Sequence, residues 1–226
     1  MLVKLPWRSA EIAPGTGLTW FDGTVSLTIR RLSTPEFSVN APVLVDIYIA
    51  AMGYNPAIRD TRINVWRRNS LNLGFTAACA LLNDRVVGIA YGFRGDQDHW
   101  WQHQLRRGLR ETGGPTTEEV EMLRDYFEVA EVHVMPGHQG MGIGRKLMLE
   151  LLHDNPAGHA ILSTPEIEGE SNYAFGLYRA LGFHDLLRHF RFDGDDREFA
   201  ILKTPLPLVP MSVPSTPHSS DNLEDS

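Results

Sequence analysis

The residues best suited to chemistry lie in a glycine-rich turn, residues 139–145, with the sequence Gln-Gly-Met-Gly-Ile-Gly-Arg. An apolar run, Tyr126–Val134, precedes it and predicts a strand, because β-branched and aromatic residues alternate there. A helix is predicted over Lys146–His153, where leucine and methionine recur with helical spacing. The glycines leave the first N–H groups of that helix unshielded, and Arg145 adds a cation. Such a helix N-terminus is an anion site, well suited to phosphate.

Two carboxylates, Glu128 and Glu131, interrupt the predicted strand. A carboxylate in an apolar strand is costly unless it is paired or functional. Each glutamate is therefore either a candidate proton acceptor or a side chain that forms a salt bridge or faces solvent. On a regular strand the two point to opposite faces, and a bulge would change that. His133 could relay a proton, although packing is the commoner role for such a histidine.

Two better-known glycine-rich motifs do not fit this turn. A P-loop needs Gly-Lys-Ser/Thr at the start of its helix, and a dinucleotide fingerprint follows the strand that opens a βαβ unit. The leading Gln139 and the following Arg145 instead resemble the acyl-CoA-binding motif Gln/Arg-x-x-Gly-x-Gly/Ala of the GCN5-related N-acetyltransferase (GNAT) family. Residues 174–183, Ala-Phe-Gly-Leu-Tyr-Arg-Ala-Leu-Gly-Phe, resemble the second signature of that family in the right order and separation.

The resemblance implies an α/β fold whose mixed, largely antiparallel central sheet is flanked by helices. Acyl-CoA would bind at a splayed strand and a helix N-terminus, with acetyl-CoA as co-substrate and no metal. The backbone of the central strand would pair with the pantetheine arm, and the glycine turn would hold the pyrophosphate. The cofactor-binding residues implied in this way are Val132, His133, Val134, Gln139, Gly140, Met141, Gly142, Ile143, Gly144 and Arg145.

The same resemblance implies catalytic roles. Glu128 stands where some histone-acetylating members carry their general base, and Glu131 lies nearer the expected thioester; either could act through a water. Tyr178 occupies the family position that donates a proton or a hydrogen bond to the CoA sulfur, and its alternative role is packing in the core. The chain departs from the family pattern at Ser171, where many members carry an asparagine that contacts pantetheine.

Composition narrows the classes of protein that remain. A chain of 226 residues suits one domain with appendages. There is no leader pattern and no apolar run long enough for a bilayer, so we expect a cytoplasmic protein without a membrane contact. The net charge of −7 argues against nucleic-acid binding and fits a cationic amine. The one cysteine, Cys79, excludes an internal disulfide, and we expect it to be a buried hydrophobe.

Three parts are predicted along the chain: an irregular N-terminal arm at 1–24, an N-acetyltransferase domain at 25–204 and a disordered, Pro/Ser-rich acidic tail at 205–226. Within the domain, alternating or apolar runs predict strands at 25–30, 75–82, 86–93, 160–164, 183–192 and 198–203. Helical patterns fall at 43–52, 57–70 and 172–181.

The acceptor side is less well defined by the sequence. In the family the first two helices line the acceptor pocket, which makes Tyr48, Met52, Tyr54 and Trp66 candidates, although core packing is the commoner role for each. The Trp- and Arg-rich insertion at 95–114 is compatible with an acceptor-site wall, a homodimer contact or a solvated helix.

The sequence thus predicts an N-acetyltransferase that moves an acetyl group from acetyl-CoA to a primary amine by direct attack in a ternary complex. The acceptor stays open between a small molecule, a protein lysine and a protein N-terminus. The alternatives are a non-catalytic acyl-CoA-binding sensor and an interaction module with the same fold.

Overall fold

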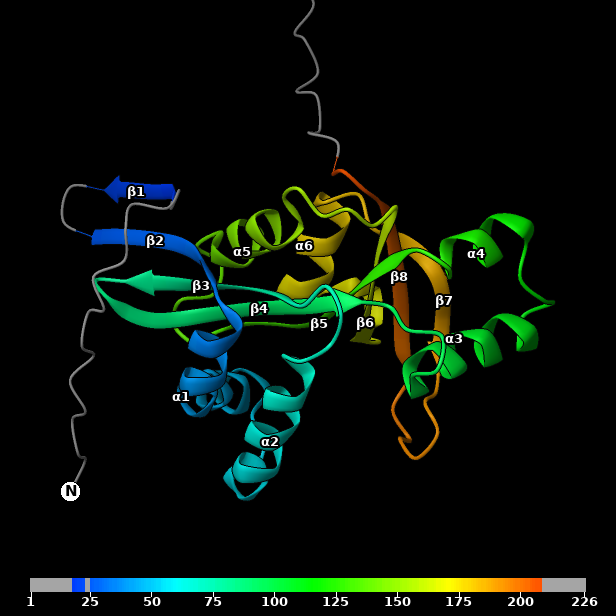
Figure 1. Ribbon diagram of the computed structural model, residues 1–226, viewed down its shortest axis with the longest axis horizontal. Coiled ribbons are helices and arrows are strands. Elements are labelled where there is room, and N and C mark those ends of the chain that lie inside the picture. Colours follow the sequence, from blue (N-terminus) through cyan, green and yellow to red (C-terminus); the bar gives the residue numbers. More distant parts are fainter. Residues whose placement is uncertain (1–17, 23–24, 209–226) are drawn as a thin grey trace, which may run out of the picture.

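One twisted sheet organises the molecule in this computed structural model, which describes residues 18–22 and 25–208 (Figure 1). Within these ranges the strand order is β1-β2-β3-β4-β5-β6-β8-β7, and every neighbouring pair is antiparallel except β5 and β6. The strands are β1 (Leu18–Asp22), β2 (Val25–Leu32), β3 (Thr76–Leu82), β4 (Arg85–Arg94), β5 (Tyr126–Val134), β6 (His159–Pro165), β7 (His184–Phe190) and β8 (Phe199–Pro205). The predicted mixed, largely antiparallel sheet is therefore confirmed.

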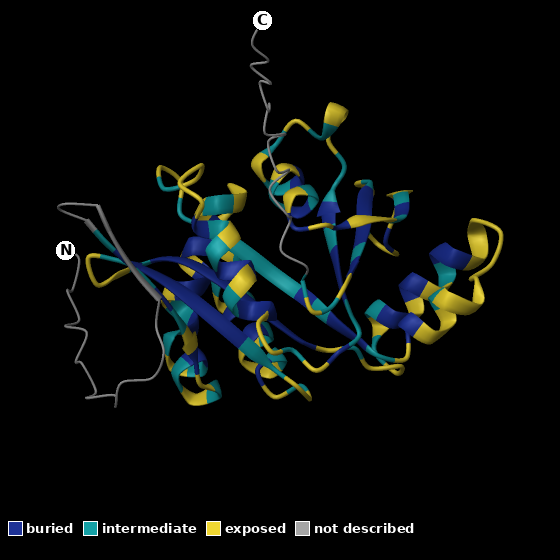
Figure 2. Ribbon diagram, turned by 90° about the horizontal axis from the view of Figure 1, so that it is seen from above, coloured by how far each residue is buried: buried dark blue, intermediate teal, exposed yellow. Residues whose placement is uncertain are grey.

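Helices cover both faces of this sheet. Figure 1 shows α5 and α6 on one side of the strands and α1, α2 and α3 on the other. Their bounds are α1 (Thr34–Met52), α2 (Arg59–Asn69), α3 (Trp100–Glu111), α4 (Thr117–Met122), α5 (Ile143–Leu152) and α6 (Tyr173–Ala180), with short 3₁₀ turns η1 (Pro56–Ile58) and η2 (Glu168–Glu170). In Figure 2 the strands are largely buried, whereas exposed residues lie on the outer sides of the helices and in the loops.

Three apolar clusters form the core. One joins α5 and α6 to the sheet, a second joins α1 and α2 to the opposite face, and a third lies between α3, α4 and the β6–β8–β7 end. The inserted segment contributes Leu105 and Leu109 to the third cluster, so α3 is packed into the protein and is not simply a solvated helix. No helix in the described part of the chain has the length and apolar content needed to cross a bilayer.

The start and end of α1 follow from its sequence. Ser33 and Glu36 form a capping box, and Gly53 ends the helix in the left-handed conformation with φ 64°. Pro42 lies inside the helix and has no N–H to donate to Ser38, four residues earlier. Arg67 of α2 donates to that Ser38 carbonyl at 3.1 Å, so the proline is accommodated by the neighbouring helix.

The prediction of an irregular arm was wrong for its last part, because Leu18–Asp22 forms β1 and pairs with β2 along its whole length. Residues 1–17 and 23–24 of the predicted arm lie outside the described residues. At the other end, Pro205 closes β8, and Leu206 and Leu208 pack against the α5–α6 core. The rest of the predicted tail, residues 209–226, also lies outside the described residues.

Candidate active site

The sheet opens between β5 and β6. These strands pair only from Tyr126 to Glu128 on β5, and from Leu162 onward β6 pairs only with β8. Residues 129–134 of β5 therefore keep their pairing with β4 on one side and have a free edge on the other. A free edge offers unpaired N–H and C=O groups to an extended ligand. Val132, His133 and Val134 lie on this edge and are partly exposed.

The glycine turn lies at the end of the free edge and is open. Gly140 and Gly142 have φ values of 76° and 73°, which non-glycine residues rarely adopt. Residues 139–142 are exposed, and α5 begins at Ile143 with no side chain capping its first N–H groups. The Ile143 side chain is buried in the core, so the helix start is anchored while its amides stay open. This geometry suits a diphosphate.

The side chain of Gln139 has a structural contact of its own. Its Nε2 donates to the Val134 carbonyl at 3.1 Å, which ties the turn to the end of β5. Gly144 packs closely against α6, since a Cβ added there would lie 3.1 Å from the Leu177 side chain. The exposed Met141 and Arg145 flank the open amides.

A bulge in β5 decides where the two glutamates point. Tyr91 of β4 pairs with Glu131 and the next residue, Gly92, pairs with Val129, which leaves Ala130 unmatched. Such an extra residue shifts the alternation of side chains. Glycine is required opposite the bulge, because a Cβ at Gly92 would lie 2.2 Å from the Glu128 carbonyl oxygen.

Beyond the bulge the even-numbered side chains, Val132 and Val134, pack on the α5–α6 face. The odd-numbered residues therefore turn to the α1–α2 face, where the His133 ring lies 5.0 Å from the ring of Tyr48 in α1. His133 Nε2 and Glu131 Oε2 lie 2.6 Å apart. Glu131 thus reaches the same face as Glu128, which a regular strand would not allow.

The two carboxylates affect each other. Burial raises the pKa of Glu128 to about 8, and the nearby negative charge of Glu131 acts in the same direction. A carboxyl group with this pKa accepts and releases a proton near neutral pH, as a general base or acid must.

Tyr178 lies on α6, facing the sheet. Its side chain is buried, its ring is 5.8 Å from that of Phe183, and its hydroxyl has no hydrogen-bond partner among the described residues. Burial raises the pKa of Tyr178, and the charge of Glu131 adds to this rise. The hydroxyl therefore stays protonated at neutral pH. Glu131 acts on both Glu128 and Tyr178, so the three candidate catalytic residues share one electrostatic environment.

The side chains at the start of α6 serve local structure. Asn172 Oδ1 accepts from the Phe175 N–H at 2.8 Å and caps the helix, and Ser171 Oγ donates to the Glu168 carbonyl at 2.9 Å. Both side chains therefore stabilise the local backbone, and the Nδ2 group of Asn172 has no hydrogen-bond partner among the described residues.

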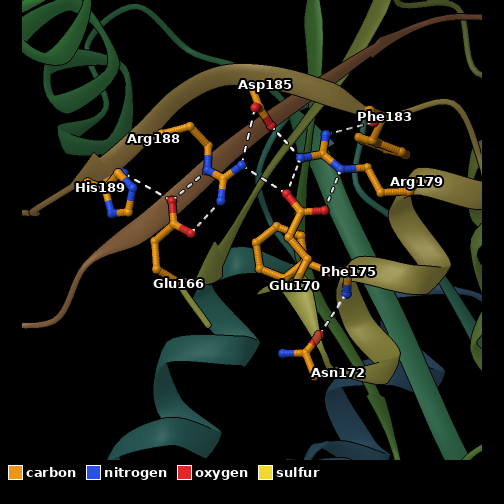
Figure 3. A network of polar contacts seen from close by, with 9 residues as sticks. All are labelled: Glu166, Glu170, Asn172, Phe175, Arg179, Phe183, Asp185, Arg188 and His189. Carbon is orange, nitrogen blue, oxygen red and sulfur yellow. Dashed lines mark hydrogen bonds and ion pairs between the residues drawn. The ribbon is translucent and has the colours of Figure 1, made fainter. Parts of the chain in front are cut away.

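An ion-pair network ties the segment after β6 to α6 and β7 (Figure 3). It joins the carboxylates and guanidiniums of Glu166, Glu170, Asp185, Arg179 and Arg188. Arg188 holds Glu166 through two bonds of 2.7 Å, which lower the pKa of Glu166 to about 2. Because Arg179 follows Tyr178 directly, the network also fixes the part of α6 that carries the tyrosine.

The four predicted acceptor-pocket residues have different surroundings. Trp66 is fully buried against Tyr48 and Tyr91, so it is a core residue. Tyr48 is buried and its ring contacts that of His133, whereas Met52 and Tyr54 are accessible.

The loop between β7 and β8 completes this side of the molecule. Arg197 of the loop donates to the Tyr54 hydroxyl at 3.0 Å. Asp193 of the same loop accepts a hydrogen bond from the Gln104 side chain of α3 at 2.7 Å. The loop therefore contacts both the segment between α1 and α2 and the inserted helix α3. A cavity of about 420 Å³ lies elsewhere, between the C-terminal end of α5 and β3, and none of the candidate site residues lines it.

Known proteins resemble this chain in sequence and in fold. Residues 43–183 match the model of the acetyltransferase (GNAT) family. A GCN5-like protein acetyltransferase of Mycobacterium tuberculosis is 35% identical over 184 residues, covering 72% of this chain and 89% of the relative. The N-alpha-acetyltransferase RimI of the same organism is 37% identical over 73 residues, or 31% of this chain and 44% of the relative. The acetyltransferase yncA of Salmonella typhimurium, solved with its cofactor acetyl-CoA, has a TM-score of 0.52 and 19% identity over 83% of this chain and 97% of its own.

Proposed function

This chain belongs to the acetyltransferase (GNAT) family, and we propose that it transfers the acetyl group of acetyl-CoA to a primary amine. One observation carries the proposal: the free edge of β5 leads directly to the uncapped N-terminus of α5. The first feature suits an extended pantetheine arm and the second a diphosphate, and the two are joined in the order that acyl-CoA presents them.

In this proposal the backbone of Val132, His133 and Val134 pairs with the pantetheine arm. The amides of residues 139–144 bind the pyrophosphate, with Arg145 as a flanking cation. The open glycine turn and the missing side-chain cap support this assignment.

The amine attacks the thioester carbonyl directly, without an acyl-enzyme. Glu128 accepts the proton that the amine loses, and its raised pKa suits that role near neutral pH. Glu131, held by His133, keeps that pKa high and adds negative charge that attracts the cationic acceptor. Tyr178 donates its hydroxyl proton or a hydrogen bond to the departing thiolate. Burial raises the pKa of Cys79 to about 11, which makes this thiol a poor nucleophile.

We assign the acceptor to the amines of polypeptides. The support is the sequence similarity to relatives named as a protein acetyltransferase and as an N-alpha-acetyltransferase. The acceptor amine would approach from the α1–α2 side, where Glu128, Glu131 and His133 point.

Thiol release from acetyl-CoA tests the proposal, with peptides offering either an N-terminal amine or a lysine and with a small polyamine as a third acceptor. Acetylation of either peptide class supports the assignment. Tight binding of acetyl-CoA with no acceptor consumed would contradict it and favour a non-catalytic sensor.

A further inference from the structure

Arg62 on α2 is the exception among the partly buried arginines of the described region. Each of the other partly buried arginines, which are Arg30, Arg59, Arg107, Arg179 and Arg188, lies within 4.0 Å of a carboxylate. Arg62 is also partly buried, yet none of the described carboxylates lies within that distance. The one described contact of its side chain is a cation–π contact with the Tyr48 ring, which leaves the N–H donors of the guanidinium without an acceptor among the described residues.

Arg62 lies near the proposed acceptor side of the site. The Arg62 guanidinium lies 5.4 Å from the ring centre of Tyr48, and that ring lies 5.0 Å from His133. The guanidinium is therefore no more than about 10 Å from the imidazole that holds Glu131. Arg62 and the Glu131–His133 pair therefore lie on the same side of the sheet, with the Tyr48 ring between them.

A second arginine in this region, Arg197, does have a carboxylate partner. Arg197 reaches the Tyr54 hydroxyl at 3.0 Å, and its charge is balanced by Asp195 at 2.6 Å. The region around Tyr48 and Tyr54 therefore has one guanidinium paired with a carboxylate, that of Arg197, and one without a carboxylate partner among the described residues, that of Arg62. Of these two arginines, Arg62 is the one whose donors have no hydrogen-bond acceptor among the described residues.

We propose that Arg62 binds an anionic group of the acceptor, so that the preferred substrate is an amine with a carboxylate a few bonds away. This inference rests on the proposed function and names the class of its acceptor. The carboxylates at Glu128 and Glu131 receive the amine end, and Arg62 receives the acid end through charge-assisted hydrogen bonds. In a polypeptide, an acidic residue beside the reactive amine supplies such a carboxylate, and a free amino acid supplies the same chemistry.

Matched acceptor pairs that differ only in charge test this inference. The first pair is the N-terminal peptides Ala-Asp-Ala-Ala and Ala-Asn-Ala-Ala, both amidated at the C-terminus. The second is N-acetylated Glu-Lys-Ala and Gln-Lys-Ala amides, and the third is β-alanine and its amide. Thiol release gives kcat/KM for each member with the wild-type protein and with Arg62→Gln, Arg62→Lys and Arg68→Gln. Arg68 is the control, since it lies exposed on the same helix and has no carboxylate partner among the described residues.

The wild-type protein should prefer the acidic member of at least one pair by about tenfold or more, because the neutral member cannot form the charge-assisted hydrogen bond to Arg62. Arg62→Gln should abolish the preference by slowing only the acidic member, Arg62→Lys should keep part of it, and Arg68→Gln should keep all of it. The pair that shows the preference identifies the source of the carboxylate.

Equal rates for the acidic and neutral members with the wild-type protein would overturn the inference, whatever the variants do. An unchanged preference in Arg62→Gln would overturn it too, and would assign Arg62 to packing on Tyr48. If amines are acetylated without any charge preference, only the inference fails. If no acceptor is acetylated, the proposed function fails with it.

Discussion

Replacing Glu128 with glutamine tests the proposed base through two independent measurements. Glutamine keeps the shape of the side chain and removes its titration. The pKa of Glu128 rises from 4.5 to about 8 because the side chain is buried and Glu131 lies nearby. The folded protein therefore holds the proton more tightly than the unfolded chain does. The stabilisation from this proton is complete below pH 4.5 and is lost as the pH rises through about 8.

The size of this effect follows from the shift. One pKa unit corresponds to about 1.4 kcal/mol, so the full rise is worth at most about 5 kcal/mol. Glu128 remains partly accessible to water, which screens the charge, and we therefore expect about 2–3 kcal/mol. Urea denaturation at intervals from pH 5 to 8 should show the Glu128→Gln protein gaining this much stability relative to wild type across the range. Glu118→Gln, at an exposed position in α4, is the control and should show no such gain.

The catalytic measurement uses an acceptor amine that is already neutral above pH 6. The wild-type kcat/KM should rise through about pH 8 and level off above about pH 9, and Glu128→Gln should lower it by about 10²–10⁴-fold and remove the rise. A variant that keeps both the rate and the pH dependence would refute the role of Glu128 as base. If instead Glu131→Gln removes the rise and Glu128→Gln does not, the base is Glu131.

Three further predictions concern the cofactor site, the leaving group and the ion-pair network. Gly142→Val should weaken acetyl-CoA binding about tenfold or more in calorimetric titration, because φ 73° is strained for a β-branched residue, whereas Leu149→Ala, at an exposed position later in α5, should bind like wild type. Tyr178→Phe should lower kcat by roughly 10²-fold with an unchanged Kd for acetyl-CoA, and an equal loss of both would point to packing. Arg188→Gln should cost about 1–3 kcal/mol in urea denaturation at pH 7, more than Arg191→Gln at an exposed pair. Because Glu166 has a pKa of about 2, this difference should be full above pH 4.5 and shrink as the pH falls towards 2.

Much of the fold could be predicted because the signals are local. The strand predicted at Tyr126–Val134 has the same bounds as β5, and Asn83 and Asp84, between two predicted strands, both have the positive φ of a tight turn. The same local reasoning failed at Leu18–Asp22, whose five residues show no clear alternation. Their strand conformation depends on pairing with β2, which no local pattern reveals.

The orientation of the site residues could not be predicted, because it depends on partners far along the chain. The bulge at Ala130 needs Gly92 on the neighbouring strand, and it alone decides that Glu131 shares a face with Glu128. The carboxylates of the acidic segment 166–170 are held by arginines on α6 and β7, which no local pattern in that segment indicates. The roles of Glu128, Glu131, Tyr178 and the residues of the turn stay predictions until they are measured.

Hydrogen exchange of the backbone amides, with and without acetyl-CoA, tests the central claim most directly. If the free edge of β5 pairs with the cofactor and the start of α5 binds its diphosphate, protection should rise within residues 130–134 and 140–144. Binding that leaves both segments unprotected, or that protects the cavity between α5 and β3 instead, would contradict the account.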